Sequence, residues 1–194
     1  ELTVIRKENA IKLSEAIMNE LRMLHMEKAQ FIVKFDSLSQ FDANGKDFVA
    51  FYISTNVGEP PKSLPKVASG GELSRMMLAL KTIFSTSNGI TSIIFDEVDT
   101  GVSGRVAQAI AEKIAAISVN SQVLCISHLP QVAAMADHHY YIKKQVEYDR
   151  TFTTLSEMEE KERVEEISRM MSGAEITELT LQHASELIQM ANER

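Results

Sequence analysis

The sequence has few of the residues that cross-link or rigidify small extracellular domains. Its 194 residues include one cysteine, four prolines and no tryptophan. One cysteine cannot form an intrachain disulfide framework, which is typical of proteins from a reducing compartment. Because Cys125 lies in the apolar run 123–126, we expect its thiol to be part of the core and unreactive.

Long apolar runs and an excess of basic residues are also missing. No run reaches the ~20 apolar residues that cross a bilayer, so we expect no membrane segment and no signal peptide. The net charge of −7 gives no overall basic signature for nucleic acid, although a local basic patch stays compatible with it. The apolar fraction of 44% suits one sizeable globular core. The chain starts at Glu1 inside a helical pattern, and we expect it to be a fragment.

The first 30 residues have the pattern of an amphipathic helix. Apolar residues recur at spacings of three and four between charged side chains. They are Ala10, Leu13, Ile17, Leu21 and Leu24. A helix that packs on its own domain and the end of a coiled coil both fit this pattern.

A hairpin and a loop follow. Segments 31–35 and 47–53 are aromatic and β-branched, and the Asn-Gly turn within 42–46 tolerates positive φ, so we expect an antiparallel pair. Segment 56–66 holds three of the four prolines and is predicted to be a loop.

A glycine pair opens the next predicted helix. Ser69 and Glu72 have capping-box spacing, and Gly70 and Gly71 let backbone N–H groups approach a ligand at the helix N-terminus. Such a terminus favours phosphate. A plain helix start is the alternative interpretation.

The most informative stretch is an apolar run that ends in acids. Residues 93–95 are apolar without alternation, which is typical of a strand buried on both faces of a parallel sheet. Asp96, Glu97 and Asp99 follow where that strand would end. Ligands bind at the carboxyl ends of parallel strands, where a carboxylate commonly holds Mg²⁺ against a nucleotide. A strand that ends in solvated acids is the alternative.

The remaining pattern predicts a βαβ unit followed by further elements. A helix over 105–117 connects the acidic strand to a second buried strand over 122–127, which ends at His128. The later elements are a short helix over 131–136, strands over 140–142 and 151–155, a helix from the acidic segment 157–166 to Gly173, and a helix over 178–192.

The order of these motifs resembles the C-terminal lobe of an ABC-type ATPase head. Within that superfamily, the amino-acid residues of these motifs resemble those of the RecN family of bacterial SMC-like DNA-repair ATPases. The resemblance rests on residues 68–75 (ASGGELSR), 95–104 (FDEVDTGVSG) and 127–133 (SHLPQVA), and extends from about residue 30 to the C-terminus. It implies an α/β fold with a mostly parallel sheet, flanking helices and an N-terminal coiled-coil helix.

The resemblance also implies roles for the acidic strand and the histidine. Asp96 would help to hold Mg²⁺ through water, and Glu97 would polarise the attacking water. His128 would contact the γ-phosphate or that water, although a histidine satisfied at a strand end is the simpler interpretation of His128 alone. Asp99 would be the D-loop aspartate that couples two sites across a dimer.

The glycine pair would be the signature motif. In the family, this motif closes in trans on ATP held by a second head. The residues that carry it here are Ser69, Gly70, Gly71 and Glu72.

The phosphate loop of this superfamily is missing from the sequence. No Gly-x-x-x-x-Gly-Lys-Ser/Thr motif occurs, so the resemblance implies an N-terminal lobe that supplies Walker A. We expect residues 1–30 to be the end of a coiled-coil helix, 31–194 to be the C-terminal lobe, and the chain alone to be inactive as an ATPase. The implied partners are that lobe, a second head in a homodimer, and DNA ends or single strands, with ATP and Mg²⁺ as cofactors in the cytoplasm at the nucleoid.

Two other classes of function stay open. A metal-dependent hydrolase could use Asp96, Glu97, Asp99 and His128 directly, if these ligands converge without a nucleotide. A non-catalytic interaction module could bind a partner through the first helix and the hairpin. Neither alternative explains why the glycine motif and Ser127-His128 flank the acidic strand in this order.

Overall fold

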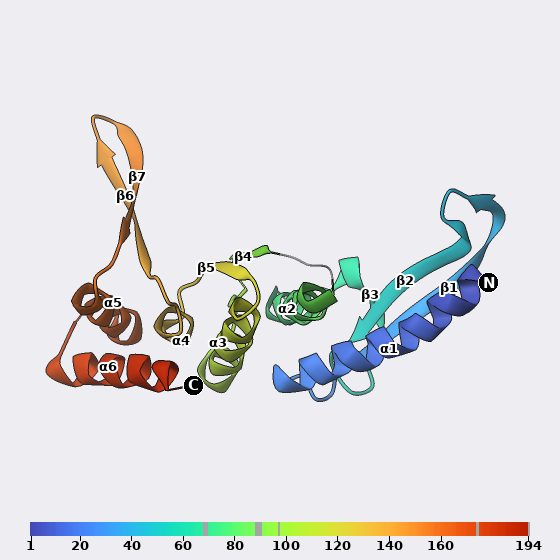
Figure 1. The fold of residues 1–194 in the computed structure, drawn as a ribbon, viewed down its shortest axis with the longest axis horizontal. Helices are drawn as coiled ribbons and strands as arrows, with labels where there is room; N and C mark the ends of the chain where they lie inside the picture. The colour runs from blue at the N-terminus through green and yellow to red at the C-terminus, as the bar shows by residue number, and fades with distance from the viewer. Residues whose placement is uncertain (68–69, 88–90, 97, 174, 194) are drawn as a thin grey trace.

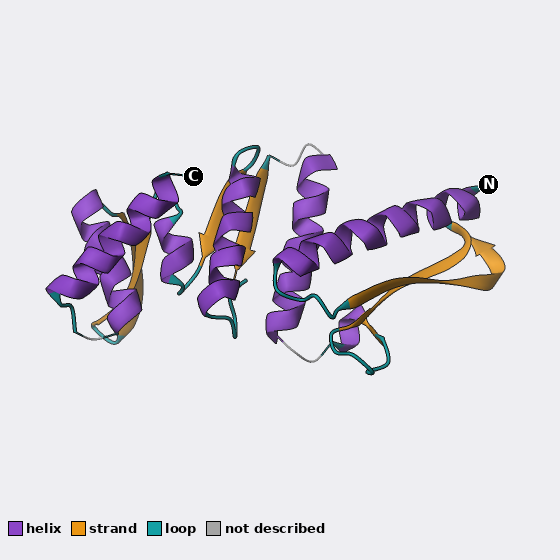
Figure 2. Ribbon diagram, turned by 90° about the horizontal axis from the view of Figure 1, so that it is seen from below, coloured by secondary structure: helices purple, strands orange, loops and turns teal. Residues whose placement is uncertain are grey.

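The computed structural model describes residues 1–67, 70–87, 91–96, 98–173 and 175–193 (Figure 1). The elements follow one another along the long axis of the molecule. A helix and a long hairpin occupy one end, a small parallel sheet lies in the middle, and a helical unit with a second hairpin occupies the other end (Figure 2). The α/β class is therefore confirmed.

The N-terminal part consists of a helix that lies along an antiparallel hairpin (Figure 2). Its elements are α1 (Leu2–Met23), β1 (Gln30–Asp42), β2 (Gly45–Ser54), β3 (Lys62–Ser63) and a 3-10 turn (Leu64–Lys66). The predicted hairpin is confirmed. The prediction of a helix up to residue 30 is wrong at its end, because the chain leaves α1 through Leu24 and turns at His25, whose φ is +58°.

One face of α1 belongs to the main core of the protein. Ile17, Leu21 and Leu24 are fully buried there, as is Met76 of the next helix, and they share this core with the buried Phe31 of β1. Val4 and Ile11, outside this buried stripe, are exposed and lie seven residues apart, the spacing of a coiled-coil seam. The helix is thus anchored to this lobe by one stripe and offers a second stripe to solvent.

The carboxylate of Asp47 fastens the start of α1 to the hairpin. It accepts hydrogen bonds from Thr3 Oγ1 (2.8 Å) and from Arg6 Nη1 (3.1 Å), while Arg6 Nη2 donates to the Asn44 carbonyl at 2.7 Å. The hydrogen bond from Thr3 lowers the pKa of Asp47, burial opposes this shift, and Arg6 lowers the pKa further.

The middle of the chain is the predicted βαβ unit. Its elements are α2 (Gly70–Ser87), β4 (Ser92–Asp96), α3 (Gly104–Ser118) and β5 (Gln122–Ile126). β4 and β5 pair in parallel, with Ile94 opposite Leu124 and Asp96 opposite Ile126. Ile93 and Phe95 are buried in the main core, which also contains the inner face of α3.

The other face of this sheet is open, contrary to the prediction of a strand buried on both sides. Ile94, Leu124 and Ile126 are 61%, 50% and 52% exposed. In the described part of the chain the parallel sheet has two strands, and the remaining pairs are antiparallel. The parallel sheet of the described residues is thus small, and among those residues no further strand pairs with it and its second face stays exposed.

The C-terminal part has a small core of its own. Its elements are α4 (Pro130–Ala134), β6 (Tyr140–Glu147), β7 (Arg150–Glu157), α5 (Glu160–Ser172) and α6 (Glu178–Asn192). Ala134, Ile167, Ala184 and Ile188 form the core between α4, α5 and α6. The β6–β7 hairpin, longer than the two predicted strands, extends away from these helices (Figure 1).

Arg163 of α5 holds the carboxyl end of α4. Its Nη2 donates to the carbonyls of Ala133, Ala134 and Ala136 at 3.3, 2.6 and 2.5 Å. Burial lowers the pKa of Arg163, and the charges of Asp137 and Glu160 oppose that shift. The last carbonyls of a helix have few backbone donors, and here the guanidinium of Arg163 supplies a charged donor to them.

We predict that Asp47 stabilises the fold in a pH-dependent way. A carboxyl group with a lowered folded-state pKa contributes stability above its unfolded pKa of about 3.9, and loses that contribution as the pH falls through the folded pKa. Asp47→Asn should therefore lower the free energy of unfolding at pH 7, and the deficit should shrink below about pH 4. Urea denaturation across this range measures it. Asp36→Asn, at an exposed carboxylate of β1, is the control, and an equal effect of both variants would contradict the prediction.

We also predict that Arg163→Met destabilises the protein more than Arg169→Met. Removal of Arg163 takes the side-chain donor from the Ala134 and Ala136 carbonyls, at a cost of about 1.5–3 kcal/mol, whereas the Ala133 carbonyl still accepts from the Ala136 N–H. Arg169 lies on the same helix, but it is itself exposed, and it pairs with the largely buried carboxylate of Glu166. Urea denaturation of both variants checks the difference, and a smaller loss for Arg163→Met than for Arg169→Met would refute it.

Candidate functional site

The predicted acidic and histidine motifs lie at one edge of the parallel sheet. Asp96 is the last residue of β4, and its partner in the register, Ile126, is the last residue of β5. His128 follows two residues later, so both motifs stand at the carboxyl ends of adjacent strands. Asp96 is exposed, and the His128 side chain is 71% exposed. Glu97 lies outside the described residues.

Asp99 is the buried centre of this edge. Only 1% of it is exposed, and its Oδ2 accepts a short hydrogen bond from Ser127 Oγ and another from the His128 backbone N–H at 3.0 Å. The Nδ1 atom of His128 lies 3.4 Å from the same oxygen. The turn after β4 and the loop after β5 are therefore joined through one carboxylate.

Ser127 is a residue of this edge that the motifs did not single out for a role. Besides donating to Asp99, its Oγ accepts the Leu129 backbone N–H at 3.0 Å. Ser127 and Asp99 are 28 positions apart in the chain, so spacing alone carries no signal for this contact.

The start of α2 packs against the same turn. A Cβ placed on Gly71 would lie 2.9 Å from the Thr100 carbonyl oxygen, whereas one on Gly70 would lie 3.9 Å from the Thr100 methyl carbon. The absence of a side chain at Gly71 thus lets α2 pack closely against this turn, in addition to any approach of a ligand. Ser69 lies outside the described residues.

Glu72 and Arg75 complete the first turns of α2. Glu72 lies in the first turn, where a negative charge suits the helix dipole. Arg75 donates from Nε to the Gly71 carbonyl at 3.1 Å and from Nη1 to the Leu24 carbonyl at 3.3 Å. Burial lowers the pKa of Arg75, and the charge of Glu72 opposes this shift. The start of α2 is thus tied to the end of α1.

The neighbouring thiol is structural, as predicted. Cys125 of β5 packs against the main core. Burial, followed by the charges of Asp99 and Asp96, raises the pKa of Cys125 to about 11. The thiol therefore stays protonated at neutral pH and is a poor nucleophile.

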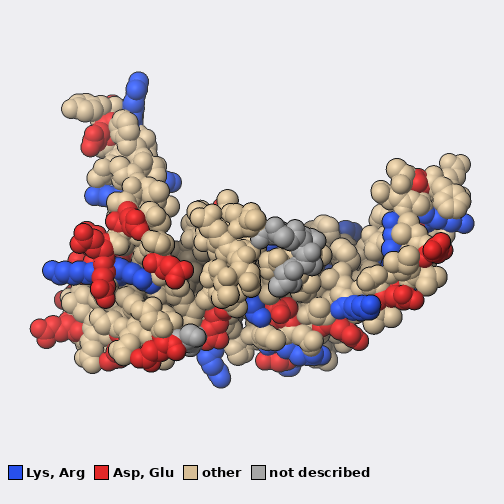
Figure 3. Space-filling view, viewed as in Figure 1, with Lys and Arg blue, Asp and Glu red and all other residues tan. Residues whose placement is uncertain are grey.

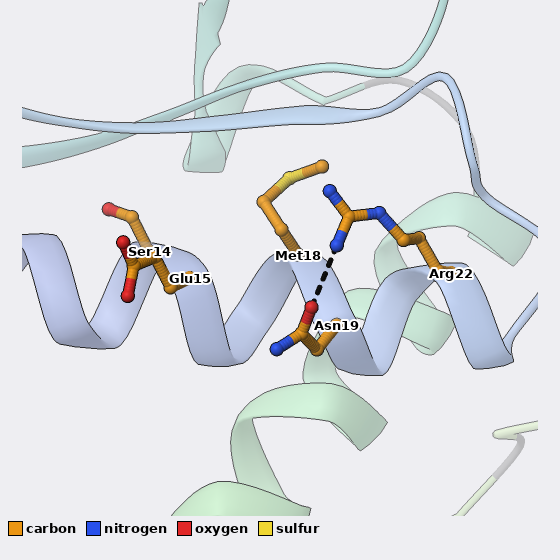
Figure 4. A pocket seen from close by; sticks show the side chains of 5 residues that line it. All are labelled: Ser14, Glu15, Met18, Asn19 and Arg22. Carbon is orange, nitrogen blue, oxygen red and sulfur yellow. Dashed lines mark hydrogen bonds between the residues drawn. The ribbon is translucent and has the colours of Figure 1, made fainter.

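Two surface hollows are lined by residues other than the predicted site. One of about 360 Å³ lies along α1 and is lined by Ser14, Glu15, Met18, Asn19 and Arg22 (Figure 4). Arg22 donates to Asn19 across it at 2.7 Å. The other, of about 540 Å³, lies by α5 and is lined by Glu159, Glu160, Lys161, Val164, Glu165 and Leu181.

We looked among the described residues for a cluster of metal ligands and for a surface of gathered basic side chains. Among them, no group of three or more His, Cys, Asp and Glu side chains is placed to hold a metal ion. Acidic side chains gather over α5 on the face shown in Figure 3, where basic side chains are scattered. None of the described helices has the length and apolar character of a membrane span.

Comparison with curated proteins identifies the relatives of this chain. No protein-family model matches the sequence. The DNA repair protein RecN of Halalkalibacterium halodurans is 62% identical over 194 residues, which cover 98% of this chain and 34% of that protein. The RecN proteins of Bacillus subtilis and Haemophilus influenzae are 54% and 38% identical and match 97% and 98% of the chain. The chain matches the C-terminal part of RecN. It spans about a third of the length of these RecN relatives.

Solved structures confirm the expected fold. A chain from work on ATP-driven dimerization and DNA-stimulated activation of SMC ATPases aligns with a TM-score of 0.56 at 16% identity, over 90% of this chain and 99% of that one. The Smc head domain of Pyrococcus yayanosii, with a coiled coil and joint, aligns with a TM-score of 0.59 at 15% identity, over 97% of this chain and 30% of that one. At these identities the likeness establishes an SMC-type head fold.

We predict that Gly71→Ala destabilises the protein while Gly70→Ala does not. The methyl group on Gly71 would press against backbone, an overpacking that costs about 1–3 kcal/mol. The methyl group on Gly70 would make an ordinary contact and change the free energy of unfolding by less than about 0.5 kcal/mol. Urea denaturation followed by circular dichroism measures both, and equal stability of the two variants would rule out the close approach of α2 to Thr100.

Proposed function

We propose that this chain supplies half of an ATP site in a RecN-type protein. The observation that carries the proposal is the convergence of three predicted motifs at one edge. The turn 98–101 contacts the start of α2 through Gly71 and Thr100, and it joins the loop after β5 through Asp99. Signature, Walker B, D-loop and switch segments would act from this edge, and an N-terminal lobe would supply Walker A.

In this proposal the exposed groups at the edge meet the nucleotide. Mg²⁺ would neutralise charge on the phosphates, and Asp96, an exposed carboxylate at the end of β4, would help to hold it through water. Glu97 would polarise the attacking water, and His128, whose imidazole is largely exposed, would contact the γ-phosphate or that water. Ser69, Gly70, Gly71 and Glu72 would close on ATP held by a second head.

Asp99 would act indirectly. Because its carboxylate is 1% exposed and its Oδ2 already accepts two hydrogen bonds within the chain, a direct contact with a second head would require the carboxylate to be uncovered first. We therefore propose that Asp99 couples the two sites of a dimer by fixing the position of the turn that carries it.

Two uncovered surfaces support an N-terminal lobe and a coiled coil as partners. Ile94, Leu124 and Ile126 form an apolar sheet face that a second layer would bury. Val4 and Ile11 form a stripe at heptad spacing, to which a second helix would dock. On this basis 1–30 is proposed as the base of a coiled coil and 31–194 as the C-terminal lobe, since relatives are about three times as long as this chain.

The cellular role follows from the relatives by analogy. They are named DNA repair proteins, and an SMC structure of like fold comes from work on ATP-driven dimerization and DNA-stimulated activation. We propose that the whole protein is an ATPase that forms a homodimer of heads and organises DNA ends or single strands during double-strand-break repair. It would act in the cytoplasm at the nucleoid, and its DNA contacts would lie largely outside this acidic chain.

Reconstitution of ATP hydrolysis tests the proposal. The chain alone should be inactive, and its mixture with a separately made N-terminal lobe that carries Walker A should hydrolyse ATP. Glu97→Gln should reduce the rate of the mixture by about 10²-fold or more, because it removes a general base. Glu160→Gln on α5 is the matched control and should leave the rate unchanged.

Two results would contradict the half-site. Hydrolysis by the chain alone would show a phosphate site that the sequence does not reveal. Absence of hydrolysis with a folded N-terminal lobe would favour an interaction module instead.

A further inference from the structure

The hydroxyl of Ser127 occupies the space between a buried carboxylate and the backbone that follows His128. A serine hydroxyl has one proton to donate and can accept in return. Here the Ser127 hydroxyl donates a hydrogen bond to Asp99 Oδ2, and the Ser127 Oγ accepts a hydrogen bond from the Leu129 N–H at 3.0 Å. The neighbouring N–H of His128 donates to the same Asp99 oxygen at 3.0 Å.

These bonds hold His128 on both sides. Its own N–H and the N–H of the next residue are both bound, and the Leu129 side chain is buried in the main core. Pro130 then begins α4 with its restricted φ. A largely exposed imidazole is therefore carried by backbone that is fixed at three consecutive positions.

The same carboxylate faces the ring. His128 Nδ1 lies 3.4 Å from Asp99 Oδ2, which leaves Nε2 as the ring nitrogen available to a ligand. A buried carboxylate next to one ring nitrogen orients an imidazole and fixes its tautomer in many sites. Asp99 can do this only if its own position is fixed, and the Ser127 hydroxyl is one of its donors.

We propose that Ser127 is a positioning residue for ATP hydrolysis, which holds Asp99 and the Leu129 amide so that His128 is presented ready for the γ-phosphate. The inference rests on the proposed function, since it takes the role of His128 from it. A misplacement of a reacting group by about 1 Å can cost about 10²-fold in rate, so loss of such a support is measurable.

Steady-state ATP hydrolysis by the full-length protein tests this. Ser127→Ala should lower kcat about 10-fold or more with little change in KM, because the support acts on the chemical step and not on ATP binding. Ser127→Thr, which keeps the hydroxyl, should restore most of the rate. Should Ser127→Ala fail to fold, Ser127→Cys keeps the shape of the side chain with a slightly larger atom, offers only a weak donor and acceptor, and should give the same split between kcat and KM.

A double-mutant cycle separates positioning from general stability. If Ser127 acts through His128, adding Ser127→Ala to His128→Ala should lower kcat no further, whereas independent effects would multiply. Hydrogen exchange at the Leu129 amide should quicken in Ser127→Ala and stay slow in Ser127→Thr. Unchanged kcat in Ser127→Ala, or multiplicative effects, would overturn the proposal.

The failure of the proposed function would look different. In that case Glu97→Gln and His128→Ala would leave hydrolysis at the wild-type rate. Loss of hydrolysis in those two variants together with full activity in Ser127→Ala would refute the role of Ser127 alone.

Discussion

The buried carboxylate of Asp99 is the constraint on which this edge of the lobe depends. A carboxylate that is almost fully removed from water needs donors, and the structure supplies them from Ser127 and from the His128 backbone. Both donors come from the loop after β5, so the charge fixes that loop relative to the turn after β4. Because Gly71 lets α2 approach the same turn through Thr100, one buried group sets the relative positions of three segments.

The sequence predicted the local elements well, since their signals are local. An Asn-Gly turn between aromatic strands and two apolar runs joined by an amphipathic helix gave the first hairpin and the βαβ unit. The end of α1 was missed because the chain turns at His25, whereas the apolar spacing continues. The run 93–95 predicted burial on both faces, yet Ile94 is exposed here. An apolar pattern reflects every neighbour that the whole protein supplies, and relatives are about three times as long as this chain.

In the candidate site, too, the sequence predicted some features and missed others. Motif spacing placed Asp96 and His128 at the carboxyl edge, because parallel strands bring their ends together whatever lies between them. It did not reveal that Asp99 is buried or that Ser127 donates a hydrogen bond to it. These two residues are 28 positions apart, and such a contact produces no periodic pattern in the sequence. The glycine pair left two interpretations open, approach of a ligand and a plain helix start, and the structure shows in addition that Gly71 meets the Thr100 carbonyl.

The loop of His128 continues directly into α4, and this short helix belongs to both cores. Val132 packs in the main core, whereas Ala134 packs with α5 and α6. Arg163 of α5 donates to the carbonyls at the end of α4, so hydrogen bonds join the two helices there. The His128 loop is therefore joined to the C-terminal helices by the five residues Pro130–Ala134. The β6–β7 hairpin lies between α4 and α5 in the chain, so both of its ends lead into this helical unit.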